Sequence, residues 1–194
     1  MTTARAAFGI CSRLVRFAPN RDGVAAVEFA IVLPFMLTLY LGSVELGDGL
    51  AIQFKTAYVA RTVTDLASQY ITIDTSMMSS ILDASSIVVT PYSPSNMVVT
   101  LSEITTNSHG SGTITWSCSL NGTPRTWGAS YTLPTNLQTP NITVLFGEVT
   151  YSYTPAIGYV ITGTINIYQN AYFYPRLTTT IGGPGTTSSS CPTS

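Results

Sequence analysis

One glutamate stands where a membrane-length apolar run begins. Glu28 lies among small and apolar residues, and from Phe29 to Val44 only the side chain of Tyr40 can ionise. A carboxylate inside a lipid-facing segment costs on the order of a few kcal/mol, so such a residue usually has a partner. The expected chemistry is therefore ion pairing, either with a cation of a neighbouring chain or with an amino terminus that a nearby cut would create.

A glycine upstream of this glutamate favours the second partner. Gly23 follows a basic leader and precedes a stretch of small residues, in which Glu28 is the fifth residue after the glycine. A cut near Gly23 would create a new amino terminus a few residues before Glu28. The spacing is thus compatible with a charge pair made by processing.

Residues that could support catalysis or metal binding are few. The single histidine, His109, lies in a turn-forming cluster, where a solvated surface position is far more common than a ligand position. No G-x-S-x-G motif, phosphate-cradling glycine loop or Cys/His metal spacing occurs. The carboxylates beyond the apolar run are scattered: Asp65, Asp74, Asp83, Glu103 and Glu148. We therefore expect no enzyme, no metal and no cofactor.

Three cysteines divide between the two sides of the apolar run. Cys11 lies in the basic leader, whereas Cys118 and Cys191 lie beyond the run. If the run marks a membrane boundary, the latter two share an oxidising compartment, where disulfides persist. A Cys118–Cys191 disulfide is the prediction, and two unrelated free thiols are the alternative.

The composition is that of an exported, strand-rich protein. Charged residues make up 9% of the 194 residues, whereas soluble domains have about 25%. The net charge of −1 gives no electrostatic reason to bind nucleic acid. Half of all Lys and Arg residues precede Gly23, namely Arg5, Arg13, Arg16 and Arg21.

The apolar run is long enough to cross a bilayer only if it includes the glutamate. The 16 residues of 29–44 fall short of the roughly 20 that a transmembrane helix needs, but an extension back to Val24 gives 21 and encloses Glu28. After the run, Glu45 and Asp48 precede Lys55. The positive-inside rule therefore places the N-terminus in the cytoplasm and most of the chain outside.

A cleaved secretory signal peptide is the alternative to a retained anchor. The basic and apolar regions of a signal peptide are present, but a small-x-small cleavage site is poor after the run, the nearest being Gly47-Asp48-Gly49. An apolar signal region also has no use for a glutamate at its start. We therefore favour the retained anchor.

Helical periodicity continues after the apolar run and then gives way to strands. Ile52, Val59, Val63, Leu66 and Tyr70 form an amphipathic stripe, so one bent helix is expected over 24–71, kinked at Pro34. A short second helix capped by Asp74, Thr75 or Ser76 follows. The predicted strands are 87–90, 97–106, 113–120, 142–154 and 164–174.

The remaining segments are less regular. Residues 121–141 form a long, proline-containing loop, and the Thr/Ser/Gly-rich residues 178–194 are expected to be a flexible tail. Five tyrosines in the last two strands would form a contact surface or are simply ordinary strand composition: Tyr151, Tyr153, Tyr168, Tyr172 and Tyr174.

The predicted fold class is α+β. A long bent N-terminal helix, transmembrane in its first half and amphipathic in its second, packs on an antiparallel sheet of about four to five strands. The predicted organisation is a basic leader at 1–23, a transmembrane helix at 24–47 and an amphipathic helix at 48–72. An extracytoplasmic α+β domain at 73–177 and a flexible tail at 178–194 follow.

The stretch RDGVAAVEFAIVLPFMLTLYLGSVELG, from Arg21 to Gly47, resembles the N-terminal signature of TadE-like pseudopilins of the tight-adherence (Tad/Flp) type IV pilus family. The likeness consists of the Ala-Val-Glu-Phe core, the apolar run with a Leu-Pro, and a following Gly and Glu. A weaker likeness lies in GEVTYSYTP and AYFYPRL near the C-terminus, a Tyr-rich strand and a Pro-Arg. The segment 72–141 carries no such likeness.

The resemblance implies a processing step and a set of partners. A prepilin peptidase would cut between Gly23 and Val24 on the cytoplasmic side, and the new amine of Val24 would pair with Glu28 of an adjacent subunit; Phe29 completes the motif. Implied partners are that peptidase, other pilin-like subunits and the inner-membrane assembly platform, besides the lipid bilayer. A minor, assembly-assisting role is the better expectation, because the globular part exceeds that of a major Flp pilin.

The implied location is the bacterial cytoplasmic (inner) membrane, spanned once, with the pilus as a further destination. Two rival functions stay open at this point. One is a membrane-anchored binding or adhesin-like β-domain unrelated to pili, and the other is a secreted hydrolase released by signal cleavage near residue 49. The mature N-terminus would distinguish all three.

Overall fold

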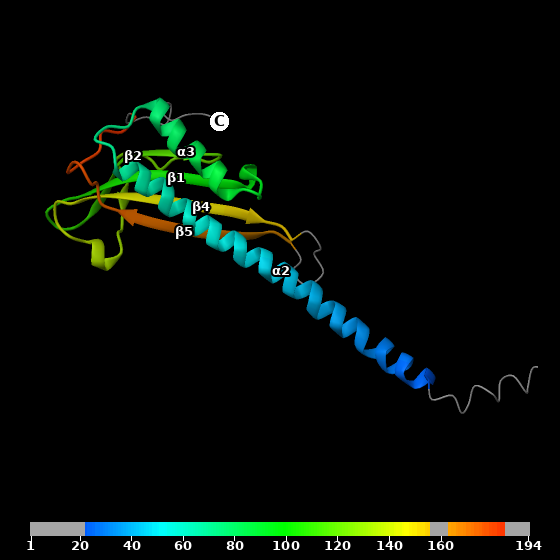
Figure 1. The fold of residues 1–194 in the computed structure, drawn as a ribbon. Helices are drawn as coiled ribbons and strands as arrows, with labels where there is room; N and C mark the ends of the chain where they lie inside the picture. The colour runs from blue at the N-terminus through cyan, green and yellow to red at the C-terminus, as the bar shows by residue number, and fades with distance from the viewer. Residues whose placement is uncertain (1–21, 156–162, 185–194) are drawn as a thin grey trace, which may run out of the picture. The chain divides into compact units, whose positions relative to one another are not determined.

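A computed structural model describes residues 22–155 and 163–184 (Figure 1). The chain divides into two compact units, Met1–Val44 and Glu45–Ser194, which are described separately below. The first helix, α2, spans Asp22–Ser68 and therefore begins in the first unit and ends in the second. Its bounds agree closely with the helix predicted over 24–71.

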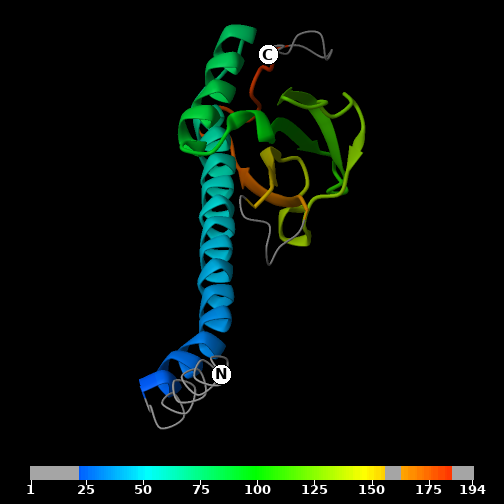
Figure 2. The ribbon, with the colours of Figure 1, turned by 90° about the vertical axis from the view of Figure 1, so that its right-hand side faces the viewer.

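The part of α2 in the first unit contains the predicted kink residue. Pro34 lies inside the helix and cannot donate a backbone hydrogen bond. The hydroxyl of Thr38 donates to the carbonyl oxygen of Pro34 (2.8 Å), a local bond of a kind that often bends helices. The ribbon bends within its blue, N-terminal part (Figure 2).

The part of α2 in the second unit packs on the sheet through one face. The predicted stripe residues Ile52, Val59 and Val63 are buried, while Leu66 and Tyr70 are partly buried against the same core. Two buried threonines on this face bond carbonyls one turn back, Thr56 to Ile52 (2.7 Å) and Thr64 to Ala60 (2.6 Å). The helix backbone therefore satisfies the hydroxyls of these two buried threonines.

Gly147 lets α2 approach the sheet closely. A Cβ at this position would lie 1.9 Å from the Thr64 hydroxyl oxygen and 3.1 Å from the Ala60 carbonyl oxygen. Any larger residue would therefore push the helix off the strand. The glycine in the middle of a strand thus has a packing reason.

The second helix, α3, spans Thr75–Val89 and is capped at both ends. The Asp74 carboxylate accepts from the Met77 amide (2.8 Å), as predicted for one of the three candidate cap residues. At the other end, Lys55 of α2 donates to the carbonyls of Val88 (3.3 Å) and Thr90 (2.6 Å).

The strand predicted over 87–90 is wrong. Residues 87–89 continue α3, because Val89 is buried in the helix-side core while Ile87 points to solvent. Side chains two apart therefore do not share a face here, as a strand would require. A run of β-branched residues favours a strand locally, but tertiary packing of the helix decides the outcome.

A five-stranded antiparallel sheet completes the fold, in the order β3-β2-β1-β4-β5. The strands are β1 Met97–Thr106, β2 Gly112–Leu120, β3 Ser130–Tyr131, β4 Thr143–Tyr153 and β5 Ile165–Phe173. Two 3₁₀ turns accompany them, Pro94–Asn96 and Thr135–Leu137. The predicted α+β class, with a long helix on an antiparallel sheet, is confirmed.

The two faces of the sheet are covered differently. The larger core lies between the sheet and the two helices and includes Val99, Leu101 and Val149. A smaller core on the other side comprises Ile104, Ile114, Leu133 and Phe146. Leu133 belongs to the segment 121–141, which the sequence predicted only as a loop. This segment also contains β3, and its residues cover the second face of the sheet.

The C-terminal segment corrects one sequence prediction. Part of the predicted flexible tail, 178–184, is packed into the domain: Ile181 is buried, and Gly182 pairs with the backbone beside Thr72. The Ile73 amide donates to the Gly182 carbonyl (2.7 Å), and the Gly182 amide donates to the Ile71 carbonyl (3.0 Å). The segment was predicted to be flexible from its Thr- and Gly-rich composition, but it contains one apolar residue, Ile181, that is buried in the domain.

Candidate functional site

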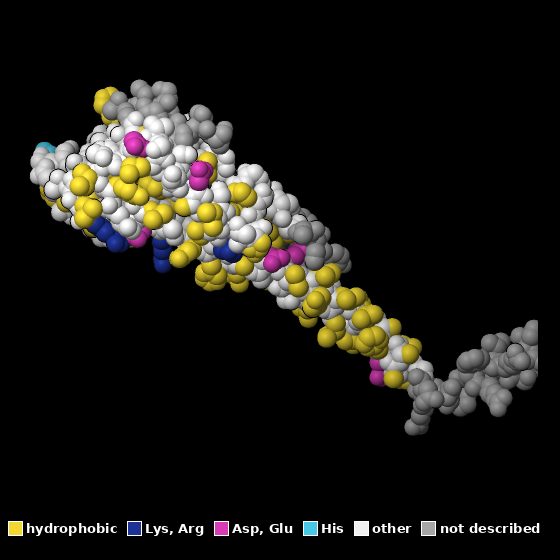
Figure 3. Space-filling model, turned by 45° about the horizontal axis from the view of Figure 1, so that its top comes forward, with side chains coloured by type: hydrophobic (Ala, Val, Ile, Leu, Met, Phe, Trp, Pro, Cys, Tyr) yellow, Lys and Arg dark blue, Asp and Glu magenta, His cyan; other side chains and the backbone are white. Residues whose placement is uncertain are grey.

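The apolar stretch of α2 presents hydrophobic side chains on all sides. Large side chains between Val24 and Val44 are exposed, among them Phe29, Phe35 and Leu39. Hydrophobic side chains cover this stretch on the face shown in Figure 3. A helix that is hydrophobic all round belongs in a core or in a membrane, and no residue of its most apolar window is buried. By length and composition, α2 is able to cross a membrane.

The predicted processing residues lie together at the start of this stretch. Gly23 and Val24 are in the first turn of α2, one turn before Glu28, and Phe29 follows. All four are exposed, and a Cβ added to Gly23 would have no atom within 4 Å. Among the described residues Glu28 makes no ion pair. The motif is therefore sterically open, and its carboxylate is available to a partner.

Of the two cysteines in the predicted disulfide, the structure describes only Cys118. Cys118 is fully buried in the core between sheet and helices and is disulfide-bonded. Cys191 lies outside the described residues, as does Cys11, so the Cys118–Cys191 pairing stays a prediction.

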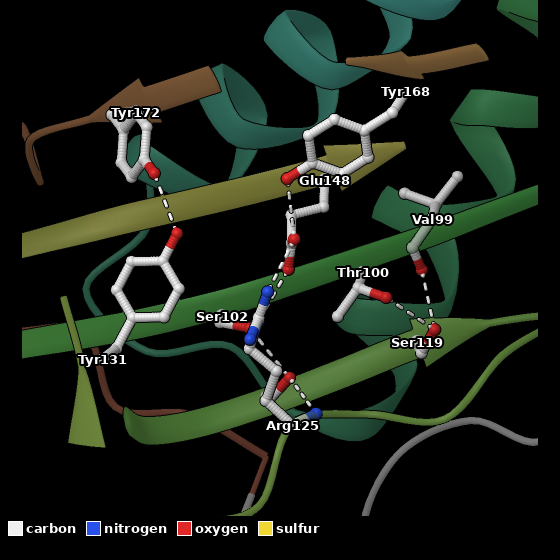
Figure 4. Close-up of polar contacts among 10 residues, drawn as sticks. Val99, Thr100, Ser102, Ser119, Arg125, Tyr131, Glu148, Tyr168 and Tyr172 are labelled. Atoms are coloured by element: carbon white, nitrogen blue, oxygen red, sulfur yellow. Dashed lines mark hydrogen bonds and ion pairs between the residues drawn. The ribbon is translucent and has the colours of Figure 1, made fainter. Parts of the chain in front are cut away.

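Sequence analysis missed a polar network on the second face of the sheet (Figure 4). Arg125 of the 121–141 loop donates from Nε and Nη2 to the two carboxylate oxygens of Glu148 on β4, each at 2.7 Å. Tyr168 of β5 donates to the same carboxylate (2.9 Å). The guanidinium also lies over the Tyr131 and Phe146 rings, 5.0 and 5.5 Å from their centroids.

The contacts within the network keep two of its side chains protonated. The Glu148 carboxylate is the main cause that raises the pKa of Arg125, and burial raises the pKa of Tyr168 to about 12. Arg125 and Tyr168 therefore stay protonated at neutral pH. Arg125 and Glu148 are 23 residues apart and on different elements, and no local motif in the sequence links them.

A second missed residue is the carboxylic acid of Glu103, which is fully buried on β1. One oxygen accepts from the Ile181 amide (2.7 Å), and the other has no partner among the described residues. The Trp116 indole donates to the Ile181 carbonyl (3.0 Å). Burial raises the pKa of Glu103 to about 7, despite its hydrogen bonds. The signal in the sequence was a glutamate inside an otherwise uncharged strand.

A further charged contact ties the end of the chain to α2. Arg176, the arginine of the Pro-Arg noted in the sequence, pairs with Asp65 of α2. Its amide also donates to the Ser68 carbonyl (3.0 Å). Asp65 and Ser68 lie in the last two turns of the helix, so this arginine anchors the segment after β5 at the helix end.

These observations define a class of protein: one N-terminal apolar helix able to span a membrane continues into an α+β domain. That arrangement agrees with a single-pass membrane protein.

The family that the sequence resembles is confirmed over this helix. Residues 23–68 match the model of the TadE-like protein family. The match begins at Gly23 and ends at Ser68, the last residue of α2, so the TadE-like region of the chain is the whole described helix apart from Asp22. No curated protein and no solved structure matches the chain.

Proposed function

We propose that this protein is a minor pilin-like subunit that acts in assembly of a Tad-type pilus after cleavage by a prepilin peptidase. The observation that carries the proposal is the TadE-like match over residues 23–68, which contains Glu28 at the start of an apolar, exposed helix. An involvement of TadE-like proteins in the Tad pilus system sets the general role, and the residues below suggest the mechanism.

Cleavage between Gly23 and Val24 would place an ammonium group at the helix start. Within one chain that amine and Glu28 are one turn apart, and between chains the same groups can pair across two packed helices. Each charge loses hydration in an apolar setting, and the attraction between the two charges offsets part of this desolvation cost. The helix would thereby be able to leave the bilayer and pack against other subunits.

The distribution of charge supports an orientation. The leader holds four arginines, whereas Glu45 and Asp48 are the first charges after the apolar stretch. The positive-inside rule then leaves the leader, and with it the cleavage site, on the cytoplasmic side. The α+β domain would lie outside, where a disulfide at Cys118 is stable.

We also propose that the domain acts by contact and not by catalysis. The two carboxylates that the fold sets apart, Glu103 and Glu148, hold a chain segment and an arginine in place. In the part of the chain that the structure describes, Glu148 accepts from Arg125 and Tyr168, and Glu103 accepts from the Ile181 amide.

The experiment that tests the role is Glu28→Ala in cells that assemble the pilus. The variant should stay in the membrane, because alanine only makes the helix more apolar, and piliation should fall by at least tenfold, since loss of one partner of a desolvated pair costs several kcal/mol. Membrane fractionation and electron microscopy of pili are the measurements. Thr38→Ala, in the same helix, is the control that should piliate normally. Normal piliation of Glu28→Ala would refute the charge-pair role.

A further inference from the structure

A row of large apolar side chains lies exposed on α2 within the second unit. Leu46, Leu50, Phe54 and Tyr58 follow one another at intervals of four residues and are exposed by 57%, 54%, 73% and 64%. We call these four residues the outer ridge. The other side of the helix packs on the sheet through Ile52, Val59 and Val63, so the ridge lies where a domain helix normally carries polar residues.

Lipid is not needed to explain the ridge. The 21 residues from Val24 to Val44 span about 31 Å as a helix, which already matches a hydrocarbon core of about 30 Å. The ridge begins after this length and continues for about 18 Å. Four large exposed side chains in one row are more than a scattered surface residue or two, and such patches mark interaction sites.

Charged residues continue the same helix face beyond the ridge. Arg61 follows Tyr58 by three residues, and Asp65 follows Arg61 by four, so both lie near the line of the ridge. Arg61 is exposed and makes no hydrogen bond or ion pair with any other described residue. Asp65 pairs with Arg176, but its side chain is 33% exposed. This helix face therefore presents the exposed guanidinium of Arg61 and, one turn further, the partly exposed carboxylate of Asp65.

We propose that the outer ridge is the contact for a second copy of this chain, with the two helices parallel and shifted by four residues. The parallel direction rests on the proposed function, because both copies would enter the membrane from the same side. Ridges at steps of four pack between one another on neighbouring helices. A shift of four places Leu50, Phe54 and Tyr58 of one copy beside the ridge residue one step earlier in the other.

The same shift brings opposite charges together. Asp65 of one copy comes level with Arg61 of the other. In an unshifted parallel pair, Arg61 of one copy would instead lie beside Arg61 of the other. The shift of four residues is also the separation of Val24 and Glu28 along the sequence. The exposed apolar side chains and the two charges thus favour the same partner, a second copy of this chain.

Replacing Arg61 gives a first test of the charge part. Arg61→Asp should reduce pairing of the copies by about two- to fivefold, in line with the small worth of exposed ion pairs, and Arg61→Gln should fall between it and the wild type. Equal pairing in all three chains would remove the charge from the proposal. Pairing is measured by the crosslinking described next.

Cysteine crosslinking tests the contact and its shift in full-length protein. Two differently tagged copies are produced in the same membrane, one with Leu50→Cys and one with Leu46→Cys, and oxidised; the wild-type chain gives the background of its own cysteines. Mixed 50–46 crosslinks should exceed 46–46 and 50–50 crosslinks at least threefold. Ser80→Cys, exposed on α3, is the matched control and should not crosslink to position 46.

The crosslinking outcomes test the shift and the contact separately. Dominant 46–46 and 50–50 crosslinks would overturn the shift, and ridge crosslinks no stronger than those of Ser80→Cys would overturn the contact and leave lipid or another protein on the ridge. The proposed function is read separately, from the mature N-terminus and from piliation of Glu28→Ala. Crosslinks without processing would refute the function alone, and processing without crosslinks would refute this contact alone.

Discussion

At the scale of single residues, two glutamates lie in apolar surroundings for different reasons. Glu28 is exposed on an apolar helix that is able to span a membrane, and it has no ion-pair partner among the described residues. Glu103 is buried inside the domain, where the Ile181 amide accounts for one oxygen only. The first is open to a partner outside the chain, whereas the second holds the chain's own C-terminal segment.

Glu103 should make the domain less stable as the pH rises. Its folded pKa of about 7 is above the ordinary value of 4.5, so its favourable contribution is complete below pH 4.5 and is lost as the pH rises through 7. We expect the free energy of unfolding to fall by on the order of 1–3 kcal/mol between pH 5 and 8 from this residue.

The comparison with Glu103→Gln isolates this effect. The glutamine keeps an acceptor for the Ile181 amide but cannot ionise, so its unfolding free energy should depend less on pH than that of the wild type. Urea unfolding of both full-length chains in detergent, at several pH values, measures the difference. Identical pH profiles would mean that the Glu103 carboxyl does not titrate in this range.

At the scale of elements, the contact between α2 and β4 determines how the helix lies on the sheet. Gly147→Ala would place a methyl group 1.9 Å from the Thr64 hydroxyl oxygen and 3.1 Å from helix backbone, which cannot yield as a flexible side chain can. We expect a loss of about 1–3 kcal/mol in stability, typical of overpacking. Thermal unfolding in detergent measures it.

Gly47→Ala is the matched control for this prediction. Gly47 lies in α2 with no atom within 4 Å of an added Cβ, so alanine should be neutral or should stabilise the helix by up to about 1 kcal/mol. If Gly147→Ala is as stable as Gly47→Ala, the close approach of helix and strand is not a constraint.

The elements also show what the sequence could predict. Strand β1 was predicted to the residue, and β2, β4 and β5 to within one residue at either end. Alternation is clean in β2, and turn residues separate β1 from β2 and β4 from β5. The outer ridge was visible as spacing but not as exposure, since the helix pattern alone does not say which apolar face the sheet covers. The two-residue strand β3 is too short for any periodicity.

Contacts between distant segments were beyond the sequence. Ile181 is one apolar residue among Thr and Gly, and its place depends on Glu103 and Trp116, which are far from it along the chain. The Arg125–Glu148 pair likewise joins a loop to a strand. Glu28 could be interpreted in advance, because its surroundings are its immediate sequence neighbours.

At the scale of the whole molecule, the chain combines a TadE-like helix with a domain that matches no solved structure. The helix supplies the processing motif and the membrane-length stretch. The domain buries one face of the same helix and leaves the outer ridge open. Under the proposed function, the same helix would contact the peptidase, then the lipid bilayer and then a second subunit.

The mature N-terminus tests the central claim most directly. The measurement is mass spectrometry of protein extracted from membranes of cells with an active prepilin peptidase, with peptidase-deficient cells as the control that should keep the leader. The account predicts Val24 as the first residue. An intact leader in peptidase-active cells, as expected for an unprocessed binding domain, or a first residue near Gly49, as expected after signal-peptide cleavage, would contradict it.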